Sequence, residues 1–334
     1  MMDTSFYTHT LLASIVLYMA ACVFYFWRTI IPREGSRWMA ARTILMLGLL
    51  VHTVNWIWRW VYSGQPPYIY LDEMTVFLVW CMVAGYLFFE YTTGHRFAGG
   101  IVAVLAVLGN GYASSVGTPV PKPLIPALQS YWVQIHVMSY IVGYGFAVVG
   151  YVIALLHLSH ETGKNRILGR IVLAISIGMV AAVSLQLLLN SSGQGPVENL
   201  RDHFSWGFAV VVCVLVYAGM EFFLRYRLSD MLPGNSVMYD LNYRCVAMSY
   251  PFLTLGIITG AIWANEAWGR YWGWDPKESL ALITWLVYGL FLHQHINAKW
   301  RTAGNVWVSI VGFWALMFTW LGVNYVLSGL HSYA

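Results

Sequence analysis

The sequence predicts an all-α polytopic membrane protein with about ten transmembrane helices and with both termini on the external face. Composition is the first observation: 59% of the 334 residues are hydrophobic and only 10% are charged, whereas soluble domains carry roughly 25% charged residues. The second is a series of ten apolar runs, most near the ~20 residues that a helix needs to cross a hydrocarbon core. The third is an uneven distribution of the basic residues among the connections.

The ten apolar runs follow one another with short polar connections. They lie at 8–28, 40–60, 74–92, 98–113, 131–158, 168–190, 205–224, 246–264, 280–298 and 304–326. The first lacks a basic start and leads into "RTIIPREGSR", so we expect a retained helix and no cleaved signal peptide. The shortest run, 98–113, is the weakest candidate for a span.

The basic residues divide the connections into two classes. With ten helices, thirteen of the eighteen Lys and Arg fall on one face: Arg28, Arg33, Arg37, Arg42, Arg96, Lys164, Arg166, Arg170, Arg225, Arg227, Arg244, Lys299 and Arg301. The other five are Arg59, Lys122, Arg201, Arg270 and Lys277. The positive-inside rule makes the first face cytoplasmic. Membrane topology therefore explains the basic residues, and no nucleic-acid partner is expected.

The polar segments are short, so we expect one integral membrane domain over 1–334 and no soluble domain. Three segments, 63–73, 114–130 and 190–204, are expected outside, and 225–244 inside; proline and glycine mark them as loops. The four cysteines, Cys22, Cys81, Cys213 and Cys245, form neither C-x-x-C nor C-x-x-C-H. This argues against a thiol oxidoreductase and against haem attached covalently to this chain; small buried apolar residues are the expected role.

The stretch "WGRYWGWDPKES" (268–279) concentrates aromatic residues in one external connection, the tryptophan-rich loop 263–279. With Trp263 it holds four of the seventeen tryptophans. Asp275, Pro276 and Glu278 suit the N-cap, first and third positions of the next helix. Interfacial anchoring explains one or two tryptophans at a helix end. Trp263, Trp268, Tyr271, Trp272 and Trp274, spaced by glycines, instead favour a platform for a large, flat, apolar ligand.

Histidine supplies the candidate metal ligands. His136 lies five residues into the fifth run, roughly 8 Å from the start of that helix, and His331 follows the last run. Both are expected on the face of the tryptophan stretch, where two neutral imidazoles could take the axial positions of a haem iron. Unrelated interfacial histidines are the alternative. His9, His95, His157, His160 and His203 are interpreted as ordinary groups at helix ends or in loops.

Three further histidines lie inside the runs. His293 is roughly 21 Å along the helix that follows Ser279, in the inner half of the membrane. His295 is the alternative inner ligand, and His52 could be a hydrogen-bond partner between helices. No histidine pair has the spacing of about thirteen residues on two helices that a transmembrane electron-transfer cytochrome suggests.

The chain resembles the CcsA/ResC-type subunit of the system II cytochrome c synthase, a haem-handling family with a tryptophan-rich WWD motif. The resemblance is strongest from "LNYRCVAMSYPFLTLGIITGAIWANEAWGRYWGWDPKES" through "LITWLVYGLFLH" to "LGVNYVLSGLHSYA". "PALQSYWVQIHV" adds a second block, and "WRWVYSG" with Glu73 a weaker third. "SGQPPYIYLDEM" departs from the more common "SGHFPLSNLYES", and 159–244 matches loosely.

The resemblance implies that His136 and His331 are external axial ligands of a non-covalently held b-type haem, that His293 is a transmembrane ligand, and that Trp263 to Asp275 form the haem platform. It implies a CcsB/ResB-type partner subunit, apocytochrome c and thiol-reducing thioredoxin-like proteins as partners. It also implies a bacterial cytoplasmic membrane or a thylakoid membrane. The expected activity is conveying haem to the outer face and joining it to C-x-x-C-H motifs, as part of a cytochrome c haem lyase.

Two other functions remain open at this level. One is a haem transporter or relay that leaves ligation to another protein. The other is a quinol-oxidising membrane cytochrome, which the absence of a second histidine pair stacked across the bilayer disfavours. No general base is assigned: Asp275 and Glu278 suit capping, and the role of Glu73 stays open.

Overall fold

The computed structural model describes residues 4–30, 37–117, 124, 126–161, 163–191, 214, 215, 217, 219, 232–296 and 303–322. All regular structure in these ranges is helical, which confirms the all-α prediction. The first half contains α1 (Thr4–Ile30), α2 (Arg37–Ser63), α3 (Leu71–Thr93), α4 (Gly99–Val116), the 3-10 turn η1 (Pro126–Gln129), α5 (Tyr131–His160) and α6 (Gly163–Ser191). The second half contains α9 (Asn235–Trp268), α10 (Pro276–Ile296), α11 (Ala303–Met317) and the π-helical turn η4 (Phe318–Gly322).

Nine of the ten apolar runs coincide with described helices. Six helices, α1, α2, α3, α5, α9 and α10, are long and apolar enough to cross a membrane, and α4 and α11 are shorter apolar helices. The seventh run, 205–224, lies outside the described residues apart from four helical positions. The count of ten and the orientation of the termini therefore stay predictions.

Two helices begin earlier than the sequence suggests. The segment 225–244 is not a loop throughout, because α9 starts at Asn235. Met238, Tyr239 and Leu241 in this first part are buried, so packing against neighbouring helices outweighs the polar residues between them. Likewise α3 starts at Leu71, inside the expected loop 63–73.

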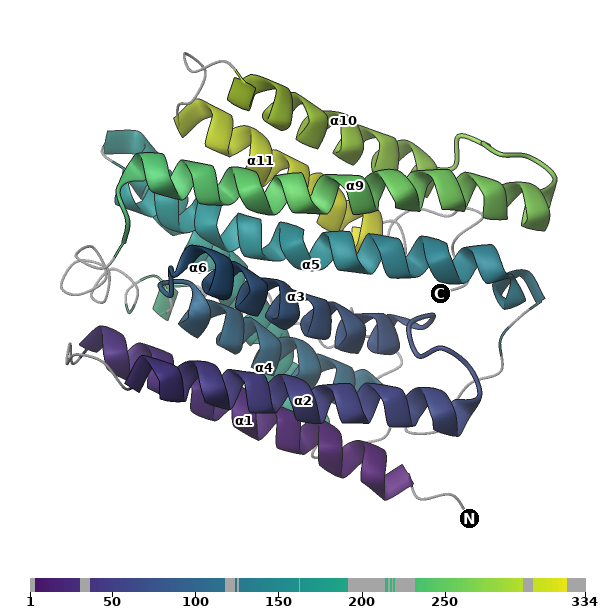
Figure 1. Ribbon diagram of the computed structural model, residues 1–334, viewed down its shortest axis with the longest axis horizontal. Coiled ribbons are helices and arrows are strands. Elements are labelled where there is room, and N and C mark those ends of the chain that lie inside the picture. The colour runs from purple at the N-terminus through teal and green to yellow at the C-terminus, as the bar shows by residue number, and fades with distance from the viewer. Residues whose placement is uncertain are drawn as a thin grey trace.

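The helices form a bundle with α5 at its centre (Figure 1). α5 packs against α9, α3, α6 and α11, and α1 packs against α2 and α4. The start of α1, the α2–α3 connection, the start of α5 and the α9–α10 connection all lie at one end of the bundle, on the right in Figure 1. We call this the tryptophan end, because it carries residues 268–274.

Close packing between α5 and α9 depends on glycine. A Cβ atom on Gly143 would lie 3.2 Å from Leu253 of α9, and one on Gly150 would lie 3.0 Å from the Cβ of Cys245. Ser249 of α9 also donates a hydrogen bond to the Gly143 carbonyl oxygen, at 2.8 Å. Small residues let membrane helices approach closely and bond through side chains, so these two helices are held in a fixed relation.

Buried polar side chains join the N-terminal helices. Arg59 of α2 forms a buried ion pair with Glu73 of α3, with 3.1 Å between the charged groups. Tyr18 Oη and His52 Nδ1 are 3.1 Å apart across α1 and α2, which confirms the prediction of a hydrogen bond between helices for His52. Glu73, whose role the sequence left open, thereby has a structural partner in Arg59.

Topology predicts where reporters inserted into two connections should appear. Gly117 lies at the tryptophan end, where a Cβ atom on it would lie 2.8 Å from the Asp72 carboxylate at the start of α3. The connection between His160 and Gly163 follows the end of α5, on the opposite side of the bundle. The charge distribution predicts that the tryptophan end faces outside. We expect an alkaline phosphatase inserted after Gly117 to be active and one inserted between His160 and Gly163 to be inactive, with a cytoplasmic fluorescent reporter giving the reverse pattern. Equal activity of both phosphatase fusions would contradict the alternating topology.

Candidate functional site

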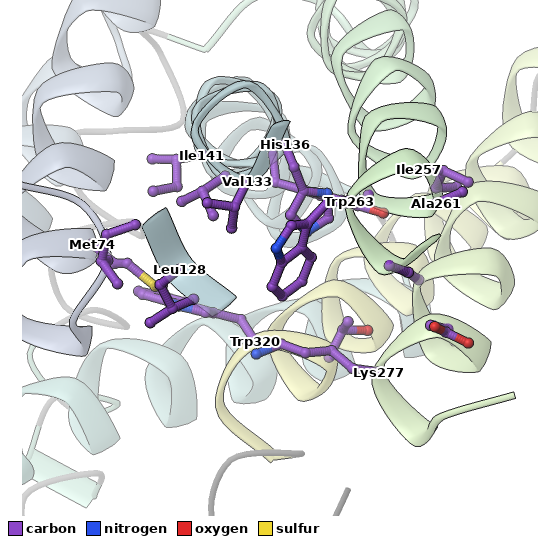
Figure 2. A pocket seen from close by; sticks show the side chains of 18 of the residues that line it. Met74, Leu128, Val133, His136, Ile141, Ile257, Ala261, Trp263, Lys277 and Trp320 are labelled. Atoms are coloured by element: carbon purple, nitrogen blue, oxygen red, sulfur yellow. The ribbon is translucent and has the colours of Figure 1, made fainter. Parts of the chain in front are cut away.

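A cavity opens at the tryptophan end between the N-terminal and C-terminal helices (Figure 2). Its volume is about 130 Å³, roughly ten times the space that a single water needs. α5, α9, α10, η1, η4, the start of α3 and the α9–α10 connection all contribute walls. Most lining groups are apolar or aromatic, so the cavity suits an apolar ligand with a few fixed polar contacts.

His136, the external ligand candidate from the sequence, lines this cavity. It projects from the second turn of α5, and its Nδ1 atom lies 2.7 Å from the carbonyl oxygen of Gly256 in α9. A carbonyl oxygen only accepts hydrogen bonds, so Nδ1 carries the proton and donates it. In the neutral ring Nε2 then keeps its lone pair, which is the arrangement found in metal-ligating histidines whose other nitrogen donates to a carbonyl.

Two glycines of α9 make room for this arrangement. A Cβ atom at Gly260 would lie 2.5 Å from the His136 ring, and one at Gly256 would lie 2.6 Å from the Tyr140 ring. Spaced four apart, Gly256 and Gly260 share one face of α9. That face forms the groove in which the His136 and Tyr140 rings lie, with 5.0 Å between the ring centroids. The imidazole is thus positioned by backbone from one helix and side chains from another.

Trp263 forms the wall beside His136. The two rings are stacked, with 5.9 Å between centroids and an interplanar angle of 28°. Trp263 is almost fully buried, and its indole N–H donates to the Ala127 carbonyl oxygen at 2.9 Å. Ser130 caps α5 and donates to Glu266 at the end of α9. These contacts fix η1, with its buried Leu128, against the end of α9.

The tryptophan stretch is partly helical. α9 continues through Trp268 and α10 begins at Pro276, so the connection proper is 269–275 and the expected loop 263–279 is wrong at both ends. Gly269 ends α9 with φ of 72°, which glycine tolerates at no steric cost. A Cβ atom at Gly273 would lie 2.9 Å from the Arg270 side chain. The described glycines thus serve the turn itself.

A capping box closes the connection, as the sequence predicts. Asp275 accepts the Lys277 N–H at 3.0 Å, and Glu278 accepts the Asp275 N–H at 3.2 Å. Glu278 also accepts the Gly273 N–H at 2.8 Å. Between these two donors lies Trp274, whose φ of 55° is unfavourable for a residue with a side chain. The Glu278 carboxylate therefore holds the backbone on both sides of this strained residue.

The predicted platform residues divide into three groups. Trp263, Tyr271 and Trp272 line the cavity. Trp268 packs behind Trp263, with 4.9 Å between ring centroids. Trp274 is 72% exposed and does not line the cavity.

The α2–α3 connection also lines the cavity, a role that was not predicted from the sequence. Ile69, Tyr70 and Met74 line the cavity, with Met74 facing it from α3 (Figure 2). Trp320 of η4 lines it from the last helical segment. In the sequence, the segment 63–73 differs from the common family pattern, and no place in the site was assigned to it. The aromatic residues just before Leu71 are the signal that could have predicted a contribution to the cavity wall.

The inner histidines occupy different environments. His293 is exposed on α10. His295 is half-buried and stacks on Tyr243, with 3.5 Å between ring centroids, and on Tyr239 at 5.3 Å. The His295 imidazole is thus packed against two aromatic rings, whereas His293 is exposed.

The remaining histidine predictions have mixed outcomes. His331 and His203 lie outside the described residues. His157 was interpreted as an ordinary surface group, but it is buried, and its Nε2 atom lies 3.3 Å from the Glu161 carboxylate. It is buried because the last turn of α5 packs inside the bundle. Within the described ranges no three His, Cys, Asp or Glu side chains gather as a metal site.

Comparison with known proteins adds two findings. A family model described as "Cytochrome C assembly protein" matches residues 68–331. The chain is 32% identical to the cytochrome c biogenesis protein CcsA of Trieres chinensis, over 97% of this chain and 93% of that protein. It is 33% identical to CcsA of Synechococcus elongatus, over 91% and 88%, and 30% identical to CcsA of Gloeobacter violaceus, over 100% and 95%.

The capping contacts predict a graded response at Asp275. Asp275→Ala removes the acceptor for the Lys277 N–H, and loss of an N-cap typically costs about 1 kcal/mol. Asp275→Ser keeps a capping oxygen and should retain most of that stability. Thermal unfolding in detergent of the two variants and the native chain measures the difference. Equal unfolding temperatures for Asp275→Ala and the native chain would contradict a capping role.

Proposed function

The chain belongs to the cytochrome c assembly protein family, and from that premise we propose that it holds haem at the cavity beside His136 and supports its attachment to apocytochrome c. The arrangement of His136 carries the proposal: Nδ1 donates to the Gly256 carbonyl, so the neutral ring carries its lone pair on Nε2, the atom that would ligate iron. The stacked Trp263 ring and the neighbouring Trp272 supply flat apolar surface for a porphyrin. We assign the second axial position to His331, following the family resemblance.

The chemistry expected at this site needs orientation more than acid–base groups. Each cysteine of a C-x-x-C-H segment adds its S–H across one vinyl group of haem: a C–S bond forms, the hydrogen goes to the other vinyl carbon, and no net oxidation occurs. Holding both reactants in place accounts for such catalysis through effective concentration. His136, Trp263 and Trp272 would orient the ring, while the connection 269–275 leaves Trp274 exposed for an approaching partner. The chain would act in this way as part of a cytochrome c haem lyase.

A second, inner haem site would be shared with a CcsB/ResB-type subunit. His293 continues an exposed apolar stripe on α10 that includes Ile283, Leu286 and Leu290. These positions are spaced by three, four and three residues and so lie on one face of the helix. An imidazole on such a face is costly in lipid, which favours a second chain that covers it and contributes the other ligand.

The proposed setting is a bacterial cytoplasmic or a thylakoid membrane, with the tryptophan end external or lumenal. The basic residues concentrated on the opposite face support this orientation. Haem would enter from the cytoplasmic side or inner leaflet and would be held outside as a b-type, non-covalently bound group until its transfer to apocytochrome c. Thiol-reducing thioredoxin-like proteins would keep the apocytochrome cysteines reduced.

The proposed ligation can be separated from haem transport alone. The chain and its partner subunit are expressed together with a C-x-x-C-H reporter in a host that lacks other assembly proteins. Ligation predicts reporter haem that survives denaturing electrophoresis, and loss of that signal in His136→Ala. A reporter that contains only extractable haem would favour the transporter.

The fit of His136 against α9 predicts a sharp effect at one glycine. Gly260→Ala places a methyl group 2.5 Å from the ring and should displace it from the Gly256 carbonyl. We expect haem per protein to fall at least several-fold, with helix content unchanged by circular dichroism. Gly111→Ala in α4 is the matched control, since nothing lies within 4 Å of that position. Equal haem content in the two variants would argue against His136 as the ligand.

The division of the platform predicts unequal effects at two neighbouring tryptophans. Trp272→Ala removes a ring that lines the cavity, and truncation of a stacked aromatic costs roughly 1–3 kcal/mol, or about 5- to 150-fold in affinity. Trp274→Ala removes an exposed ring and should leave haem affinity nearly unchanged, while weakening transfer to apocytochrome. Absorption titration with haem and the reporter assay measure the two effects. A larger affinity loss in Trp274→Ala than in Trp272→Ala would contradict the arrangement.

The contrast between the inner histidines predicts their behaviour in the complex. With the partner subunit, His293→Ala should remove the inner haem, and added imidazole should restore low-spin absorption by filling the vacant position. His295→Ala should leave the inner haem in place, because the His295 ring packs against Tyr239 and Tyr243 and its Nε2 atom lies 3.9 Å from Asp240 of α9. The measurement is haem per protein, with absorption spectra, for both variants. An inner haem retained in His293→Ala but lost in His295→Ala would reverse the assignment.

A further inference from the structure

Glu278 links the cavity at the tryptophan end to the connection 269–275. It is the third residue of α10, and it lines the cavity. Trp272 lines the same cavity and directly precedes Gly273 in the chain. The backbone N–H of Gly273 donates to the Glu278 carboxylate at 2.8 Å. A side chain from the start of α10 thus holds the backbone immediately after a ring of the cavity wall.

One oxygen atom of Glu278 holds the backbone on both sides of Trp274. The Oε2 atom that accepts the Gly273 N–H also accepts the Asp275 N–H, at 3.2 Å. Between these donors Trp274 has φ of 55°, in the left-handed region. This conformation is unfavourable for a residue with a Cβ atom, because that atom approaches the carbonyl oxygen that follows. Such backbone persists only where the surrounding structure holds it, and the Glu278 carboxylate supplies two of the contacts that do so.

The backbone conformation at Trp274 also affects the cavity wall. The Trp272 and Trp274 rings are in edge-to-face contact, with 5.8 Å between centroids and an interplanar angle of 87°. One ring lines the cavity, whereas the other is exposed. A rotation of the backbone at 274 out of the left-handed region would redirect the chain on both sides. We therefore expect it to move the Trp272 ring relative to the cavity.

We propose that Glu278 is a positioning residue of the haem site: it stabilises the left-handed backbone at Trp274 and thereby keeps the Trp272 ring in the cavity wall. This role rests on the proposed function and adds a control over the shape of its site. The apparent affinity for a ligand falls with the fraction of chains in the binding-competent conformation. Loss of the Glu278 carboxylate should therefore weaken haem binding although every aromatic ring of the cavity remains.

The test compares the loss of Glu278 in two chains that both lack the exposed indole, Trp274→Ala and Trp274→Gly. Alanine keeps the cost of the left-handed conformation, whereas glycine removes it. Adding Glu278→Ala should therefore weaken haem binding about 5- to 30-fold more in the Trp274→Ala chain than in the Trp274→Gly chain. Absorption titration with haem in detergent measures the four affinities.

Hydrogen exchange of residues 269–275, followed without haem, tests the contact by itself. Glu278→Ala should speed the exchange of this segment at least several-fold. Glu278→Gln keeps a carbonyl oxygen that can accept both N–H groups, so it should retain slow exchange and most of the haem affinity. Asp275→Ala is the capping control, because it removes the acceptor of the Lys277 N–H at the same helix start. Its effect on haem affinity should be the same in both Trp274 backgrounds.

The outcomes separate positioning from helix capping and from the haem site as a whole. Equal losses of haem affinity from Glu278→Ala in the two Trp274 backgrounds would show that Glu278 only caps α10, and would overturn the positioning role. Equal exchange rates in Glu278→Ala and the native chain would overturn it as well. If the native chain binds no haem, the proposed haem site is wrong and the positioning of haem fails with it. The exchange rates would then still confirm or contradict the hold of Glu278 on the connection.

Discussion

The close contact between α5 and α9 is the constraint on which the site depends. Glycines on both helices remove the side chains that would hold them apart: Gly143 and Gly150 on α5, and Gly256 and Gly260 on α9. Because the helices lie so close, a backbone carbonyl of α9 can accept a hydrogen bond from His136 of α5. The same packing that makes the core thus also fixes the orientation and tautomer of the imidazole. A site built on two rigid helices holds its ligand more accurately than one built on loops.

The connection between α9 and α10 is ordered by its own polar groups. Glu278 and Asp275 satisfy the backbone donors at the start of α10, and Gly269 ends α9. This short, tightly held turn keeps Trp272 in the cavity wall and Trp274 in the exposed position. The two tryptophans therefore divide between the cavity wall and the exposed surface, although they lie two residues apart.

The N-terminal helices complete the cavity from the other side. The buried ion pair between Arg59 and Glu73 joins α2 to α3, and removing one member of such a pair leaves an uncompensated charge. It lies at the start of α3, next to Tyr70 and Met74 in the cavity wall. The α2–α3 connection and α3 thus contribute to a cavity whose candidate metal ligand, His136, lies on α5.

The sequence by itself determined the helical membrane architecture, because apolar runs of sufficient length have few alternatives in a bilayer. It also determined the capping box at Asp275, since that motif is local. It identified His136 and the tryptophan stretch as candidates and placed them at one end of the bundle. Only the tertiary structure decided which aromatic rings line the cavity, because Trp272 and Trp274 are indistinguishable by composition and differ through backbone conformation. The tertiary structure alone also showed the Gly256 carbonyl beside His136 and the aromatic rings that stack on His295. It alone showed that Met74, Lys277 and Trp320 line the same cavity. These contacts join residues far apart in the chain, so the sequence could not predict them.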